Sequence, residues 1–341
     1  LRIAVVGCGR IFSVYHDAFQ RLKDELRPVL MVDKDLARAE AAASAYEGCL
    51  ASNQTELTAF GELLERARPD LLCVLLPHFL HGRYAIAAME HGVHVLTEKP
   101  VTISLAEADE VIAVRKRTGV QLGVIFQNRY ITGVQRVREL IAGGELGTVR
   151  GAFSTLTWHR PPSYYACDWK GRWETEGGGV VIDQAIHSID LVRYMTGMDA
   201  VKVMGHTARR VLTEIEVEDE ADAAIWLENG AVYAFCACNY FTANSPIRVG
   251  ISCENGEVLL TGETVEISWK DGGREVIRPD AGMTRGGESY WGSCHYIQLA
   301  ECCRVLREGK AIPWTAEDAG KTLRVVQGIY ESARIQGIIS L

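Results

Sequence analysis

An aspartate and a histidine four residues apart form the pair in this sequence best suited to acid–base chemistry. Asp183 and His187 lie in a stretch, residues 183–195, whose apolar spacing predicts a helix. Side chains at i and i+4 of a helix project from one face, about 5–6 Å apart at Cβ, so the carboxylate can orient the imidazole. A neutral imidazole exchanges protons near physiological pH. Asp190 follows three residues later, and the sequence leaves open which acid orients the ring.

A lysine that follows a predicted strand is the second candidate for chemistry. Residues 94–96 are predicted to form a buried strand, and Lys99 stands three residues later in a Glu-Lys-Pro motif. Ligands of parallel sheets bind at the carboxyl ends of the strands. The Lys99 ammonium is therefore placed to stabilise negative charge on a ligand oxygen. The simpler alternatives are a loop lysine here and a surface or capping pair at Asp183 and His187.

A glycine turn, Gly7-Cys8-Gly9, follows the first predicted strand, residues 3–6, and opens a helix. Glycine permits a tight turn and a close backbone approach, and the N–H groups and dipole of a helix N-terminus hold phosphates. The arrangement is typical of a dinucleotide-binding turn, although Phe12 stands where the third glycine of G-x-G-x-x-G is usual.

An acidic residue ends the second predicted strand, where such turns place a ribose ligand. Asp33 lies 24 residues beyond Gly9, and a carboxylate there binds the adenine ribose hydroxyls and repels the 2′-phosphate of NADP. NAD is therefore the predicted cofactor, with NADP as the alternative because Lys34 and Arg38 lie close by. The alternative role for Asp33 is capping of the next helix.

The first 125 residues alternate between short apolar runs and helix-length mixed segments. This alternation predicts a parallel sheet covered by helices. The predicted strands are residues 3–6, 29–32, 71–76, 94–96 and 121–125, and the predicted helices include residues 35–46, 82–91 and 104–117. Ser104 followed by Glu107 forms a capping box for the last of these helices.

Strands dominate the second part of the chain. Predicted strands are residues 149–158, 201–209, 221–227, 231–240, 248–253 and 258–260, and predicted helices lie near 183–195, 290–307 and 316–334. Asn229-Gly230 and Asn255-Gly256 are hairpin signals between apolar runs. We therefore predict an α/β Rossmann dinucleotide-binding domain over residues 1–125. An α+β domain on an open, mostly antiparallel sheet is predicted over residues 126–341, with the cleft between the two as the ligand site.

Composition narrows the class of protein. Of the 341 residues 48% are hydrophobic, so a buried core is expected, and the net charge of -8 argues against a nucleic-acid partner. The longest apolar run, residues 71–76, is far too short for a membrane helix, and the strand-like run that leads into Gly7 does not fit the pattern expected of a signal peptide. The ten cysteines lack the paired spacing of a zinc site, so no metal is predicted. Free thiols suit a cytoplasmic location.

Four motifs in order carry a family resemblance. They are the glycine turn at 7–9, the Glu98-Lys99-Pro100 motif, the triple glycine at 177–179, and the helix with Asp183 and His187. With them the chain resembles, over essentially its whole length, the Gfo/Idh/MocA oxidoreductases. Further matching segments are residues 77–81, residues 143–147 and Glu218-Asp219.

The resemblance implies an enzyme that transfers a hydride between NAD(P) and a secondary alcohol or ketone carbon of a sugar, cyclitol or sugar derivative. It implies that His187 is the general acid or base, that Lys99 stabilises charge on the reacting oxygen, and that Asp183 orients His187 or the substrate. Expected cofactor-binding residues are Gly7, Gly9, Arg10, Ile11, Asp33, Pro77, His81, Glu98 and Lys99. A homodimer or homotetramer formed through the second-domain sheet is also implied.

Aromatic and basic residues are concentrated in the segment 158–173, ahead of the triple glycine. Aromatic faces pack on sugar C–H surfaces, and arginine grips carboxylates or phosphates. We expect Arg160, Tyr165 and Trp169 to contact substrate, together with Lys99, Asp183 and His187. The alternative is that these aromatics hold the loop together or face another subunit. An anionic sugar and a neutral one are equally compatible with this segment.

Two other functions are weighed against the dehydrogenase. A glycosidase of the same fold would hold NAD tightly and show no net change of the nicotinamide, and a regulator would sense a dinucleotide or sugar without catalysis. The regulator could dispense with both Lys99 and His187, so their joint presence argues against it.

Overall fold

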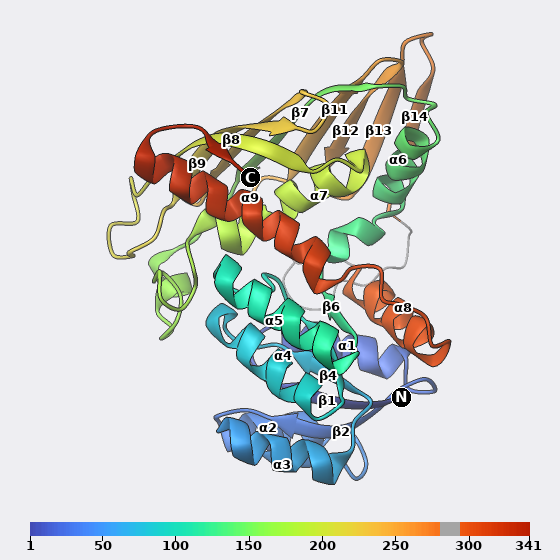
Figure 1. Cartoon of the computed structure of the whole chain (residues 1–341), viewed down its shortest axis with the longest axis vertical. Helices are drawn as coiled ribbons and strands as arrows, with labels where there is room; N and C mark the ends of the chain where they lie inside the picture. The colour runs from blue at the N-terminus through green and yellow to red at the C-terminus, as the bar shows by residue number, and fades with distance from the viewer. Residues whose placement is uncertain (280–293) are drawn as a thin grey trace. The chain divides into compact units, whose positions relative to one another are not determined.

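The computed structural model describes residues 1–279 and 294–341 (Figure 1). By their contacts these residues divide into two compact units. The first contains residues 1–127 and 294–320, and the second contains residues 128–279 and 321–341. Residues 294–320, which the sequence analysis assigned to the second domain, thus belong by contacts to the first unit.

The first unit contains a parallel six-stranded sheet of order β3-β2-β1-β4-β5-β6. Its strands are β1 (Arg2–Val6), β2 (Arg27–Val32), β3 (Leu50–Ser52), β4 (Leu71–Val74), β5 (His94–Thr97) and β6 (Leu122–Val124). Four consecutive residues of β1 and all of β4 are buried, as expected for strands covered on both faces. The predicted Rossmann class is confirmed. Strand β3 was not predicted, because it is a three-residue edge strand without an apolar run.

Helices surround this sheet. They are α1 (Phe12–Arg21), α2 (Leu36–Ala43), α3 (Leu57–Ala67), α4 (His81–Glu90), α5 (Leu105–Thr118) and α8 (His295–Arg307), with the short 3₁₀ segment η1 (His78–Leu80). A second 3₁₀ segment, η2 (Gln127–Tyr130), follows β6 and belongs mostly to the second unit. The predicted cap of α5 is present, since Ser104 Oγ accepts the Glu107 N–H at 3.3 Å. Helix α3 was not among the predicted helices.

The second unit contains a nine-stranded sheet of order β14-β13-β12-β11-β7-β10-β9-β8-β15. Its strands are β7 (Val149–Thr157), β8 (Ala200–Ala208), β9 (Glu220–Leu227), β10 (Val232–Cys238), β11 (Arg248–Cys253), β12 (Gly256–Thr261), β13 (Thr264–Trp269), β14 (Arg274–Ile277) and β15 (Ile339–Ser340). All pairs are antiparallel except β7 with β10, so the predicted sheet type is confirmed. Both predicted hairpins form, between β9 and β10 and between β11 and β12.

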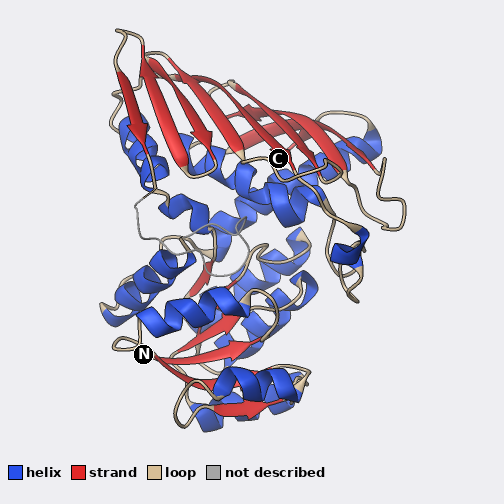
Figure 2. Cartoon of the chain, turned by 180° about the vertical axis from the view of Figure 1, so that it is seen from behind, coloured by secondary structure: helices blue, strands red, loops and turns tan. Residues whose placement is uncertain are grey.

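One face of this sheet is covered by helices α6 (Thr132–Ala142), α7 (Ile186–Thr196) and α9 (Ala316–Ile335), as Figures 1 and 2 show. Side chains alternate along the strands: Tyr233 and Phe235 of β10 are buried, whereas Val232 and Ala234 are exposed. The core of the unit therefore lies between the sheet and these helices. Within the described residues, no helix has the length and apolar character needed to cross a membrane.

Candidate active site

The glycine turn after β1 is shaped for a close ligand. Gly7 has a φ of +96°, and a Cβ there would lie 2.4 Å from the Leu75 carbonyl oxygen, so only glycine fits. At Gly9 the position of a Cβ has no neighbour within 4 Å among the described atoms. Helix α1 begins just beyond, and its N-cap residue Ile11 makes no side-chain capping hydrogen bond. Open space at Gly9 beside a helix N-terminus suits a pyrophosphate.

Asp33 lies against this turn. Its side chain is 7% exposed; Oδ2 accepts the Cys8 N–H at 2.7 Å and Oδ1 accepts the Asp35 N–H at 2.9 Å. The alternative that Asp33 caps α2 is wrong, because Asp35 is the cap and accepts the Ala37 N–H at 3.0 Å. A carboxylate thus stands beside the turn, where the sequence analysis expected it.

His81 joins the two loops that follow β4 and β5. Its ring is fully buried, with Nδ1 2.6 Å from the Pro100 carbonyl oxygen and Nε2 2.7 Å from that of Leu76. Burial lowers the pKa of His81 to about 3, so the ring is neutral and donates one N–H. The buried ring therefore packs between the two loops and donates to one of their carbonyl oxygens.

Glu98, the residue before Lys99, is fixed by side chains of α1 and α8. Tyr15 Oη donates to Glu98 Oε1 at 2.7 Å, and His295 Nε2 lies 3.6 Å from the same oxygen. Burial raises the pKa of Glu98 and, together with the nearby Lys99 charge, lowers that of His295 to about 3. The backbone of Lys99 thus follows a carboxylate that is anchored within the first unit.

The triple glycine, residues 177–179, packs closely against Glu218 in the second unit. A Cβ on Gly179 would lie 1.9 Å from the Glu218 carbonyl oxygen, and one on Gly178 would lie 2.0 Å from Tyr330 Oη. The Glu218 carboxylate accepts the N–H groups of Gly179 (2.8 Å) and Val181 (3.0 Å) and the Tyr330 hydroxyl (3.0 Å). It caps the N-terminus of the helical segment that carries the predicted catalytic pair.

The first turn of that segment is a π-helix, η4 (Val181–Ala185), and α7 begins only afterwards. The expectation of regular α-helical spacing from Asp183 to His187 is therefore wrong, because π hydrogen bonds span five residues instead of four. The Asp183 Oδ2 atom accepts hydrogen bonds from Tyr164 Oη at 2.7 Å, Lys170 Nζ at 2.5 Å and Gln184 Nε2 at 2.5 Å.

Lys170 is buried between two carboxylates. Its Nζ lies 2.5 Å from Asp183 Oδ2 and 3.1 Å from Glu176 Oε1, and its side chain is 9% exposed. Burial alone would lower the pKa of Lys170, but the Asp183 charge outweighs burial and raises it, so the ammonium persists. Burial raises the pKa of Glu176. Neither Lys170 nor Glu176 was predicted as a site residue, since nothing in their spacing along the chain shows that they are buried together.

The predicted substrate loop is held by its own side chains and by residues that follow β10. Arg160 is 3% exposed; its guanidinium lies over the Trp158 ring at 4.6 Å and donates to the His159 carbonyl oxygen. The Tyr165 hydroxyl accepts from Asn239 Nδ2 at 3.2 Å. The structure thus engages the Arg160 guanidinium within the loop, as the alternative interpretation described, and also with Asn244 Oδ1 at 3.2 Å.

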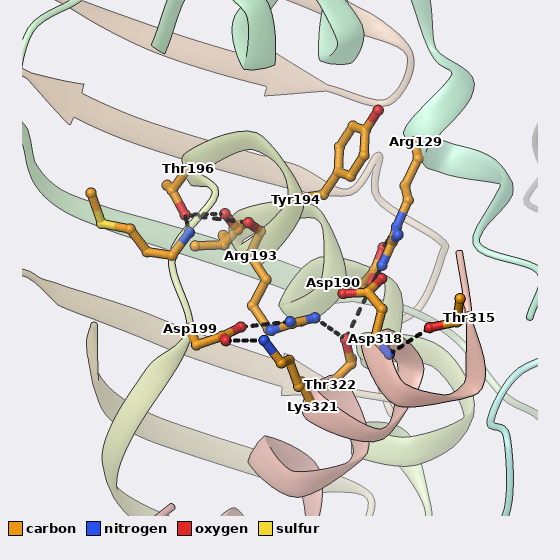
Figure 3. Close-up of polar contacts among 12 residues, drawn as sticks. Arg129, Asp190, Arg193, Tyr194, Thr196, Asp199, Thr315, Asp318, Lys321 and Thr322 are labelled. Atoms are coloured by element: carbon orange, nitrogen blue, oxygen red, sulfur yellow. Dashed lines mark hydrogen bonds and ion pairs between the residues drawn. The ribbon is translucent and has the colours of Figure 1, made fainter. Parts of the chain in front are cut away.

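Asp190, the other acid considered for orienting His187, belongs to a buried ion network (Figure 3). Arg129 of η2 pairs with its carboxylate, with Nε 2.8 Å from Oδ2, and Thr322 of α9 donates to Oδ1 at 3.2 Å. Arg193 also donates to Thr322 Oγ1 at 2.7 Å. Asp190 therefore binds α7 to η2 and α9, which fixes the helix that carries His187.

Comparison with known proteins places this architecture in a family. Residues 1–126 match the GFO_IDH_MocA model, an oxidoreductase family with an NAD-binding Rossmann fold. Residues 134–259 match the GFO/IDH/MocA C-terminal domain.

Curated relatives and solved structures agree with both matches. The chain is 27% identical over 247 residues to D-glucoside 3-dehydrogenase of Escherichia coli K12, covering 68% of each chain. It is 30% identical over 283 residues to scyllo-inositol 2-dehydrogenase (NAD(+)) of Bacillus subtilis 168, covering 77% of this chain and 75% of that one. The WlbA dehydrogenase of Bordetella pertussis, solved with NADH and UDP-GlcNAcA, superposes with a TM-score of 0.85 at 25% identity over 100% and 98% of the chains.

The Glu218 cap makes a pH-dependent prediction for stability. Burial raises the pKa of Glu218 from 4.5 to about 7 in the folded protein. The unfolded chain therefore releases the proton first, and the wild type should lose roughly 3 kcal/mol relative to Glu218→Gln as pH rises from 4.5 to 7. Urea unfolding across this pH range measures the difference. The exposed Glu257→Gln serves as control, and a wild-type-to-variant difference that is constant with pH would contradict the assignment.

Proposed function

Because the chain belongs to the Gfo/Idh/MocA oxidoreductase family, we propose that it is an NAD-dependent dehydrogenase of a sugar, cyclitol or sugar derivative. The reaction moves a hydride between nicotinamide and a secondary alcohol or ketone carbon. The observation that carries the proposal is the match of both family domains in their order, at 1–126 and 134–259. Names of relatives, a glucoside dehydrogenase and an inositol dehydrogenase, support the substrate class.

Residues of the first unit would hold the cofactor. The Gly7 and Gly9 turn and the following Arg10 and Ile11 bind the pyrophosphate through backbone N–H groups. The Asp33 carboxylate binds the adenine ribose, which favours NAD over NADP. Pro77, His81, Glu98 and Lys99 form the two loops expected on the nicotinamide side. When bound, the nicotinamide supplies the hydride acceptor or donor.

Lys99 and His187 carry out the proton and charge chemistry. His187 takes the hydroxyl proton in oxidation and returns it in reduction. The Lys99 ammonium donates a hydrogen bond to the same oxygen and stabilises its developing negative charge. Asp183 positions the substrate or His187, and Lys170 forms an ion pair with its carboxylate.

Substrate contacts come from the loop ahead of the triple glycine. Tyr165 and Trp169 offer aromatic faces for the C–H surface of a sugar. Arg160 also remains a predicted contact, although its guanidinium is engaged within the loop. We place the enzyme in the cytoplasm, because all ten cysteines are free thiols, which suits a reducing compartment.

We also propose that copies associate through the open face of the second-unit sheet, as a homodimer or homotetramer. Cross-strand partners form a small-residue and apolar row over that face, namely Met204, Ala224, Ala234, Phe153 and Gly250. Met204 is 52% exposed and Phe153 is 39% exposed. An apolar row of this length on a solvent face is typical of an interaction surface.

The first test is turnover with NAD⁺ and a panel of aldoses, glucosides and inositols, followed by nicotinamide absorbance. At least one compound should be oxidised, and Lys99→Ala and His187→Ala should each lower kcat/KM by about 10²–10⁴. His187→Ala should keep the wild-type Kd for NADH, and the exposed Lys116→Ala should change neither value. Near-normal kcat/KM in both variants contradicts the roles. Cleavage of a glycoside without net nicotinamide change contradicts the dehydrogenase.

Cofactor choice is tested at Asp33. Asp33→Ser removes the carboxylate that repels a 2′-phosphate, so the ratio of kcat/KM with NAD to that with NADP should fall by about tenfold or more. Asp35→Ser is the matched control, since serine also caps a helix well and α2 should persist. An unchanged ratio in Asp33→Ser removes the proposed ribose contact.

Association is tested by light scattering after gel filtration. The wild type should have the mass of a dimer or tetramer, and Phe153→Asp should shift it towards the monomer because a charge in an apolar interface stays unpaired. Ala113→Asp on the exposed side of α5 is the control. A monomeric wild type, or an unchanged mass in Phe153→Asp, rejects this surface.

A further inference from the structure

A pocket of about 470 Å³ lies in the second unit between two loops. One loop, residues 162–172, contributes Pro162, Tyr165, Lys170 and Arg172. The other, residues 211–216, connects β8 to β9. The volume falls within the range of small-molecule sites.

One buried carboxylate, that of Asp219, holds the backbone of the β8–β9 loop in place. Asp219 accepts the N–H groups of Arg210 at 2.7 Å, Val211 at 2.8 Å and Leu212 at 2.7 Å. Three charge-assisted hydrogen bonds from consecutive residues fix the backbone of this wall. The wall is thus pre-formed before any ligand binds.

The two loops are also joined to each other. The Glu216 N–H donates to the Gly171 carbonyl oxygen at 2.7 Å, and Trp173 Nε1 donates to the Glu216 carbonyl oxygen at 3.1 Å. Ile215 packs so closely on Gly171 that a Cβ there would lie 2.9 Å from its side chain. These contacts set the width of the pocket.

Two residues belong both to this pocket and to the group around Asp183. Lys170 lines the pocket while its Nζ lies 2.5 Å from Asp183 Oδ2. Tyr165 lines it as well and accepts a hydrogen bond from Asn239, which donates in turn to Gln184. The pocket therefore adjoins the group proposed to position the substrate.

The charges of the lining residues determine which class of ligand the pocket favours. The lining carries two cations, Lys170 and Arg172, and two carboxylates, Glu214 and Glu216. Because Lys170 already pairs with two buried acids, no cation surplus is left for a phosphate or carboxylate. The charged side chains of the lining offer hydrogen bonds to hydroxyl groups, and Tyr165 supplies an aromatic side chain.

We propose that this pocket is a subsite for an uncharged second sugar ring, so that the preferred substrate is a neutral glycoside whose other ring is oxidised. The inference rests on the proposed dehydrogenase function. The sequence was equally compatible with anionic and neutral sugars as substrates, whereas the charges of this pocket favour neutral glycosides.

The experiment compares pairs of substrates that differ only in the second ring. They are maltose with methyl α-D-glucopyranoside and cellobiose with methyl β-D-glucopyranoside, with glucose 1-phosphate as the anionic probe. In at least one pair kcat/KM for the disaccharide should exceed that for the methyl glycoside by about tenfold. Thr213→Trp, at the exposed tip of the β8–β9 loop, should abolish this ratio by filling the pocket. Ala113→Trp on α5 should leave it unchanged.

A charge variant tests the same pocket independently of packing. Glu214→Lys should raise kcat/KM for glucose 1-phosphate relative to the methyl glycosides several-fold, because the lining then has a cation surplus. Equal use of disaccharide and methyl glycoside by the wild type, or a wild-type preference for glucose 1-phosphate, overturns the subsite. Turnover of inositols alone leaves the dehydrogenase standing and removes the subsite, whereas no turnover of any compound removes both.

Discussion

The second unit depends on how two adjacent buried carboxylates, Glu218 and Asp219, are satisfied by backbone N–H groups. Glu218 accepts from Gly179 and Val181 and so caps the segment with Asp183 and His187. Asp219 accepts three N–H groups and closes the β8–β9 loop. A buried carboxylate without such donors is strongly unfavourable, so both elements are fixed relative to the start of β9. The segment with Asp183 and His187 and the wall of the pocket are therefore both held by neighbouring residues at the start of β9.

In the first unit the comparable constraint is close backbone approach. Gly7 faces the Leu75 carbonyl oxygen with no room for a side chain, and the Asp33 carboxylate receives the next N–H, that of Cys8. His81 and Glu98 are buried, and their contacts fix the loops that follow β4 and β5. The residues expected to meet a cofactor therefore stand on loops whose other sides are packed and hydrogen-bonded. Such support is what precise positioning requires.

Local patterns predicted what depends on local chemistry. The buried runs of β1 and β4, the Ser104 cap and the Asn229-Gly230 hairpin all follow from side-chain type and spacing, and each is present. Strand β3 was missed because three half-buried residues have no periodicity to recognise. The π turn at Asp183 was missed because its sequence is compatible with an ordinary helix. The roles of Lys99 and His187 remain predictions drawn from family motifs.

The sequence by itself determined the class of both units, the glycine turn after β1, and the family with its hydride chemistry. These features follow from hydrophobic periodicity, glycine positions and short motifs, each of which involves only a few neighbouring residues. Only the tertiary structure decided that Asp190 pairs with Arg129, that Asp35 caps α2, and that Lys170 lies between Asp183 and Glu176. Burial and charge pairing bring together residues that are distant in the chain. Spacing along the chain therefore does not predict which carboxylate a buried cation will pair with.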